Sequence, residues 1–148
     1  MRIWHKSMIS VLPRQQLVAQ WRELSSAAAN IKSKGTPNHI LINKIMNYDL
    51  DHFITYAKLV RAEMTRRGYK TMDSVWNKIV SVKPDWKEVE FEELYEGWHT
   101  ERYLRQCYYN LEEKFDCGGL TQEEYNVLLF KVNGPLHLNY EKKYNWLK

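Results

Sequence analysis

The residues best suited to chemistry lie in the first 24 positions, where an N-terminal amine and a single carboxylate occur together. An α-amine is a weaker base than a lysine side chain, so more of it is neutral and nucleophilic at physiological pH. Arg2 is too bulky for ordinary removal of the initiator methionine, so we expect Met1 to present this amine. An amine that attacks a sugar C1′ forms a Schiff base with the ring-opened sugar.

Glu23 suits the second role in such chemistry. It is the only acidic residue among the first 48. A carboxylate close to the sugar would stabilise the positive charge that builds when a base leaves, and could move protons in a later elimination. The alternative is a surface glutamate paired with Arg22 or another cation. Residue types alone leave both interpretations open.

Basic side chains surround this pair in the sequence. Arg2, Arg14 and Arg22 could contact phosphates, and so could Lys32 and Lys34. The alternative for each is a solvated surface charge. The C-terminal residues 136–148 combine aromatic and basic side chains, which suits base stacking with phosphate contact or docking into the core. The candidates for DNA contact in this tail are Lys142, Lys143, Tyr144 and Trp146.

The sequence predicts that a helix carries most of these N-terminal candidates. Apolar residues repeat at helical spacing from about Pro13 to Ala29, and the buried stripe should hold Leu17, Trp21, Leu24 and Ala28. Residues 30–38 contain lysines, a glycine and a proline, which indicates a basic loop. Glu23 would then lie on the first helix, off its buried stripe.

Similar patterns predict further helices over Asp49–Arg67, Asp73–Val80, Thr100–Phe115 and from Thr121 to about Phe130. The last begins with a capping box, and residues 83–97 read as acidic and irregular. No alternating strand is evident. We expect one all-α domain over 1–148: three main helices, one or two short helices, and an extended aromatic C-terminal tail.

Basic and acidic residues are distributed unevenly along the chain. Residues 1–70 hold 12 Lys or Arg and four Asp or Glu, whereas residues 71–130 hold six and 13. This suits a basic face for a polyanion, or a solvated surface. No apolar run approaches 18 residues, so we expect a cytoplasmic protein. Cys107 and Cys117 should be reduced. The five histidines share no metal-ligand spacing, and no cofactor motif occurs.

Two stretches resemble the pyrimidine-dimer DNA glycosylases of the phage endonuclease V type. They are Met1-Arg2-Ile3 and the segment from Gln15 to Leu24, which contains Arg22-Glu23; residues 63–69 and 111–114 are similar more loosely. The resemblance implies a helical enzyme that kinks DNA, flips a nucleotide, cuts the glycosyl bond of a cyclobutane pyrimidine dimer and nicks the strand as an AP lyase. No metal or cofactor is implied.

By the same resemblance, the Met1 amine is the nucleophile and Glu23 the catalytic carboxylate, while Arg2, Arg22 and Lys114 contact DNA. Gln16 stands where the phage enzymes have a DNA-contacting histidine, so we expect it at the interface too. The implied partner is double-stranded DNA with a damaged or modified base, bound by a monomer that associates with the nucleoid.

Departures from the phage pattern keep other functions open. The phage enzymes expose a threonine amine, have one residue fewer before the position of Gln15, and carry arginines at the positions of Ser26 and Asn110. The alternatives are the same chemistry on another base and a non-enzymatic helical nucleic-acid-binding module. A third is a protein-interaction domain, with contact surface supplied by Trp4, Trp86 and Trp98.

Overall fold

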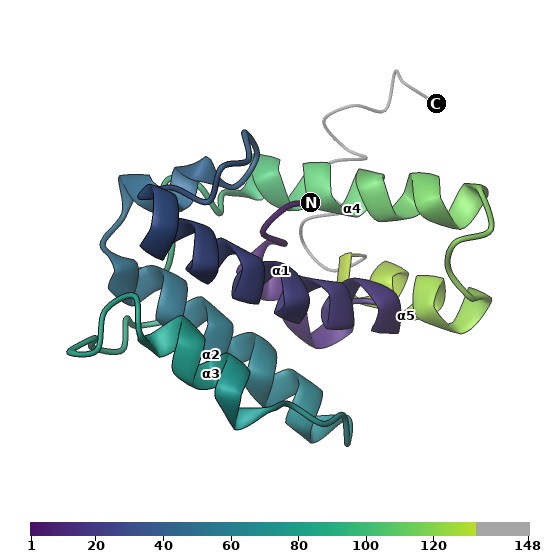
Figure 1. Ribbon diagram of the computed structural model, residues 1–148. Coiled ribbons are helices and arrows are strands. Elements are labelled where there is room, and N and C mark those ends of the chain that lie inside the picture. The colour runs from purple at the N-terminus through teal and green to yellow at the C-terminus, as the bar shows by residue number, and fades with distance from the viewer. Residues whose placement is uncertain (133–148) are drawn as a thin grey trace.

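A computed structural model describes residues 1–132, and within them the chain is all-helical, as predicted (Figure 1). Three helices are long, as expected from the sequence. The tail candidates Lys142, Lys143, Tyr144 and Trp146 lie outside the described residues. In chain order the elements are η1 (Lys6–Val11), α1 (Arg14–Lys34), η2 (Asn43–Asn47), α2 (Leu50–Arg66), α3 (Asp73–Val80), α4 (Glu101–Asp116) and α5 (Gln122–Val132).

Helix α1 is longer than predicted, because it continues to Lys34 rather than ending near Ala29. The prediction of a loop over 30–38 is therefore wrong for its first five residues, and Lys32 and Lys34 belong to the last turn of the helix. Ile31 continues the buried stripe at 8% exposure. Gly35 ends the helix at φ 76°, where its N–H reaches the Ile31 carbonyl.

Two 3₁₀ helices, η1 and η2, were not predicted. Both are short, and 3₁₀ segments of this length leave no 3.6-residue pattern in a sequence. In η1 the cap is His5, whose Nδ1 accepts a hydrogen bond from the Ser7 N–H at 3.0 Å. The N-terminal segment is thus partly helical rather than wholly extended.

The later helices begin at side-chain caps. Thr100 caps α4, with its hydroxyl accepting from the Tyr103 N–H. The predicted capping box of α5 is confirmed: Thr121 Oγ1 accepts from the Glu124 N–H at 3.1 Å, and Glu124 accepts from the Thr121 N–H at 3.0 Å. Local sequence therefore fixes where both helices start.

The N-terminal segment lies between α1 and α4 (Figure 1). Ile3 and Trp4 are buried, as is the predicted stripe of α1. Tyr103 of α4 donates its hydroxyl hydrogen to the Ile3 carbonyl. The first residues are consequently held by core packing and by α4, so the position of the chain start is set by the fold.

Burial also tests the interaction-domain alternative. Trp4 and Trp98 are each only 5% exposed, so the expectation that they supply contact surface for a protein partner is wrong. Trp86 is half-buried and packs edge-on against Trp76. Trp4 and Trp98 therefore belong to the hydrophobic core, and Trp86 packs partly buried against it.

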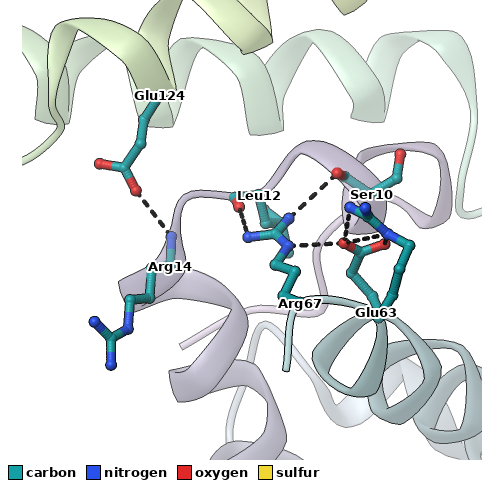
Figure 2. Close-up of polar contacts among 7 residues, drawn as sticks. Ser10, Leu12, Arg14, Glu63, Arg67 and Glu124 are labelled. Carbon is teal, nitrogen blue, oxygen red and sulfur yellow. Dashed lines mark hydrogen bonds and ion pairs between the residues drawn. The ribbon is translucent and has the colours of Figure 1, made fainter. Parts of the chain in front are cut away.

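A buried carboxylate holds the turn before α1. Glu63 of α2 is 7% exposed and accepts hydrogen bonds from Arg66 and Arg67 (Figure 2). Arg67 also donates to the backbone carbonyls of Leu12 at 2.8 Å and Ser10 at 3.2 Å. The end of α2 is thereby tied to the segment that leads into α1.

Cys107 is buried and Cys117 exposed, and both are free, as predicted. Among residues 1–132, no helix is both long and apolar enough to cross a membrane.

Candidate active site

A cleft of about 710 Å³ lies where the N-terminal segment meets α1 and α4. Most of its lining comes from the first half of α1, between Arg14 and Glu23. Helix α4 contributes Asn110 and Lys114, and the turn after α1 contributes Leu41. The chain start opens into this cleft, because Met1 is among its lining residues.

The cleft gathers most of the residues predicted from the sequence. Those lining it are Met1, Arg2, Arg14, Gln16, Arg22, Glu23 and Lys114. Lys32 and Lys34 do not line it, because 11 helical residues, or ~16 Å, separate Lys34 from Glu23. The fold thus joins residues from the two ends of the described chain that the sequence alone could not place together.

Glu23 is the only carboxylate among the cleft-lining residues. It is half-buried, and burial raises its pKa above the ordinary value for a glutamate. The positive charges of the Met1 amine, Lys114 and Arg22 oppose this rise without cancelling it. Glu23 is therefore electrostatically coupled to the amine and is a stronger base than a solvated glutamate.

Gln20 connects Glu23 to the N-terminal segment, and sequence reasoning missed it. Its side chain is fully buried. Its Nε2 donates to Glu23 Oε2 at 3.2 Å and to the Arg2 carbonyl at 3.0 Å. Its Oε1 accepts from the Trp4 N–H at 2.9 Å and lies 2.9 Å from the Tyr56 hydroxyl. One amide thus fixes both the carboxylate and the backbone that carries the amine.

A signal for Gln20 exists in the sequence. It lies three residues after Leu17 and four before Leu24, so it borders the apolar stripe of α1. A glutamine at such a position is expected to be buried and hydrogen-bonded. Its partners could not be predicted, because Trp4 and Tyr56 are distant in sequence.

Two cationic side chains of the cleft, those of Arg2 and Lys114, lie close to the ring of Trp4. Trp4 lines the cleft and is nearly buried. The Arg2 guanidinium carbon lies 5.3 Å from its ring centroid, and Lys114 Nζ lies 6.0 Å away. Cations within about 6 Å of a ring face are attracted to it. Trp4 therefore helps to hold two positive charges beside the chain start.

Gln16 offers an unused hydrogen-bonding atom. It lines the cleft and is 8% exposed, and its Oε1 has no hydrogen-bond partner among the described residues. A buried acceptor without a partner costs about 1–3 kcal/mol. A ligand that enters the cleft with an N–H donor could satisfy it.

Arg14 lines the cleft and is the first residue of α1. Its backbone N–H donates to Glu124 of α5 at 2.9 Å (Figure 2). Its guanidinium lies over the Tyr69 ring, 5.3 Å from the centroid. The side chain is exposed, so it remains accessible to an anionic ligand.

The cleft brings together groups that are capable of covalent and electrostatic chemistry. It combines an N-terminal amine, one partly buried carboxylate and the four cationic side chains Arg2, Arg14, Arg22 and Lys114. Within residues 1–132, no three side chains of His, Cys, Asp or Glu are grouped as a metal-binding cluster would require. Such a cleft can attract a polyanion and present a nucleophile beside a base.

Comparison with known proteins identifies one related family. The family model for pyrimidine dimer DNA glycosylase matches residues 1–77, just over half of the chain. The matched region contains α1, α2 and the cleft residues from Met1 to Leu41, whereas Asn110 and Lys114 of α4 lie beyond it. Comparisons with curated proteins and with solved structures gave no significant match.

Proposed function

Because this chain belongs to the pyrimidine dimer DNA glycosylase family, we propose that it excises a UV-induced cyclobutane pyrimidine dimer and then nicks the strand as an AP lyase. The observation that carries the proposal is the shared cleft, in which Met1 and Glu23 lie among four cationic side chains. The substrate is double-stranded DNA, whose phosphates would contact these cations.

In the first step, the neutral Met1 amine attacks C1′ of the damaged nucleotide. The N–C1′ bond forms as the glycosyl bond breaks, and the base leaves with the bonding electron pair and takes up a proton. The sugar ring then opens to a protonated imine joined to Met1. Glu23 stabilises the positive charge that develops on the sugar during this exchange.

In the second step, a base removes a proton from C2′ of the imine. The electron pair of the broken C–H bond forms the C1′=C2′ bond of an enamine and neutralises the iminium nitrogen. The nitrogen lone pair then restores the iminium, the C2′=C3′ bond forms, and the C3′–O bond breaks as the 3′ phosphate leaves with the bonding electron pair. Water finally hydrolyses the imine and releases the enzyme. Glu23 is the proposed proton acceptor, because burial raises its pKa above the ordinary value and it is coupled to the amine.

The other cleft residues would bind rather than react. Arg2, Arg22 and Lys114 would hold phosphates on either side of the extruded nucleotide. Arg14 would extend this contact along the strand. Gln16 Oε1, which lacks a partner among the described residues, would accept an N–H from a base. These contacts would make binding depend on salt, whereas the chemistry depends on Met1 and Glu23.

The proposal is tested with a duplex that carries one cis-syn thymine dimer. Glu23→Gln should lower the single-turnover cleavage rate by about a hundred- to a thousandfold, the usual loss when a preorganised electrostatic group is removed. Affinity for the duplex should persist, because the phosphate-binding cations remain. Cleavage is followed on denaturing gels, and affinity by fluorescence anisotropy.

Glu113→Gln provides a matched control. Glu113 is an exposed glutamate on α4 and is not among the cleft-lining residues. This variant should cleave as the unmodified protein does. Equal cleavage rates for Glu23→Gln and Glu113→Gln would refute the catalytic role of Glu23. Cleavage of an abasic duplex without cleavage of the dimer duplex would keep the lyase chemistry and refute the dimer as substrate.

A further inference from the structure

Two adjacent apolar side chains project into solvent beside the cleft. Ile40 is 86% exposed and Leu41 is 51% exposed, in the turn between α1 and η2. Their neighbours Ile42 and Ile45 are 1% and 0% exposed. The chain therefore buries some apolar residues of this segment and leaves these two outside.

The turn that presents them is rigidly hydrogen-bonded. The N–H groups of Ile42 and Asn43 both donate to the His39 carbonyl, at 3.0 and 2.8 Å. Asn43 Oδ1 accepts from the His39 N–H at 2.9 Å and from the Thr36 hydroxyl at 3.0 Å. Because the backbone is tied down on both sides of the pair, its exposure is a property of the fold.

The pair lies at the boundary between two hollows. Leu41 lines the cleft that contains Met1 and Glu23. Ile40 and Leu41 also line a second hollow of about 360 Å³. Its other lining residues are Arg2, Lys44, Trp98, Tyr103 and Gln106. Cations therefore flank the apolar pair, and Arg2, like Leu41, is shared by both hollows.

We propose that Ile40 and Leu41 form a wedge that enters the base stack of duplex DNA beside the reacting nucleotide. The inference rests on the proposed function, which makes DNA the ligand of the cleft. An apolar tip between cations matches a duplex, whose phosphates are anionic and whose stacked bases are apolar. Apolar side chains inserted between base steps unstack them and kink the duplex. The wedge would thereby open the stack next to Glu23.

The test uses a duplex with a tetrahydrofuran abasic-site analogue, which lacks the C1′ functional group and cannot react. A 2-aminopurine base next to the analogue fluoresces more strongly when it is unstacked. Saturating protein should raise this fluorescence. Ile40→Ser and Leu41→Ser, singly and together, should diminish the rise, and the double variant should bind about tenfold more weakly because two apolar contacts are lost.

Met72→Ser is the matched control, since Met72 is another exposed apolar side chain, 67% exposed, and lines neither hollow. It should unstack 2-aminopurine as the unmodified protein does. All variants are compared by thermal unfolding, which should change little at exposed positions. A fluorescence rise in the double variant equal to that of the unmodified protein, at saturation, would overturn the wedge.

The same measurement separates the wedge from the enzyme. An unmodified protein that cleaves dimer DNA but leaves 2-aminopurine stacked would refute the wedge alone. An unmodified protein that unstacks 2-aminopurine in a wedge-dependent manner, but forms no imine with a natural abasic duplex, would refute the proposed function and support the wedge.

Discussion

Glu23 and Gln20 work as one unit at the scale of single residues. Burial raises the pKa of Glu23, and the Gln20 amide donates to its carboxylate while holding the backbone of residues 2 and 4. A carboxylate that accepts protons must be ionised before the reaction. Protonation of Glu23 and protonation of the Met1 amine should each slow cleavage as pH falls. The part of this acid limb that Glu23→Gln removes should lie above the ordinary range for a glutamate.

Changing Gln20→Glu tests this coupling. A second carboxylate beside Glu23 would raise the pKa of Glu23 further by like-charge repulsion. The Glu23 part of the acid limb should consequently move to higher pH. The measurement is a pH–rate profile on the dimer duplex, with circular dichroism to verify folding at each pH.

Tyr56→Phe is the control for this shift. The Tyr56 hydroxyl lies within hydrogen-bonding distance of Gln20 Oε1 and of the Trp4 carbonyl, at 2.9 and 2.6 Å, and is equally buried. Its loss should destabilise the fold by about 1–2 kcal/mol without moving the acid limb, because no charge is added near Glu23. An acid limb that is unchanged in Gln20→Glu would contradict the assignment of that limb to Glu23.

At the scale of elements, the contact between α2 and the turn before α1 determines where the cleft helix begins. Arg66 and Arg67 bind the same carboxylate, that of Glu63, but their surroundings differ. The Arg67 side chain is 18% exposed and also binds two backbone carbonyls, whereas that of Arg66 is 65% exposed. Arg67 should therefore contribute more to the free energy of unfolding than Arg66 does.

Arg67→Met should lower the free energy of unfolding by about 2–4 kcal/mol, because it removes a partner from a buried carboxylate and from two carbonyls. Arg66→Met should cost much less than Arg67→Met, because the Arg66 side chain is exposed and solvent screens its ion pair. Urea denaturation at pH 7 measures both. Equal losses for the two variants would contradict the proposed anchoring of the segment before α1 by Arg67.

The helices themselves could largely be read from the sequence, because their signals are local. The apolar stripe of α1 and the capping threonines at 100 and 121 act within a few residues. Gly68, which follows the end of α2 at φ 81°, is also a local signal. The end of α1 differs from the prediction because the helix continues through Lys32 and Lys34 to Gly35, with Ile31 extending the buried stripe. The 3₁₀ segments were missed because they have no long-range periodicity.

The site was only partly predictable for a different reason. Residue types and the family resemblance predict Met1, Arg2 and Glu23 as candidates, and the fold brings them into one cleft. The contribution of Gln20 depends on Trp4 and Tyr56, which are 16 and 36 residues away. The exposure of Leu41 depends on how the turn is tied to Thr36 and Asn43. Contacts of this kind follow from tertiary structure and leave no spacing rule.

At the scale of the whole molecule, a buried histidine pair makes the N-terminal packing sensitive to acid. His5 and His99 stack with ring centroids 5.1 Å apart. Burial lowers the pKa of His5 to about 4 and that of His99 to about 2. His5 Nδ1 accepts from the Ser7 N–H and His99 Nδ1 from the Lys6 N–H. Protonation of either ring would set two donors against each other.

Because these pKa values are lower in the folded state, the stabilisation is complete above the unfolded value of about 6.5 and is lost as pH falls. As pH falls from 6.5 to 5, the loss of unfolding free energy per histidine should steepen toward a limit of about 1.4 kcal/mol per pH unit. Urea denaturation at pH 7, 6 and 5 measures this slope. His99→Gln should make it shallower, and a slope unchanged by that variant would contradict the assignment.

The central claim is that the Met1 amine forms a covalent imine with the sugar. The most direct test is borohydride trapping on abasic and thymine-dimer duplexes, using protein with an untagged N-terminus whose free amine is verified by intact mass. We predict an adduct on both duplexes that maps to the N-terminal peptide at Met1, and none when the amine is acetylated. An adduct that maps to a lysine, or no adduct from protein with a verified free amine, would contradict the account.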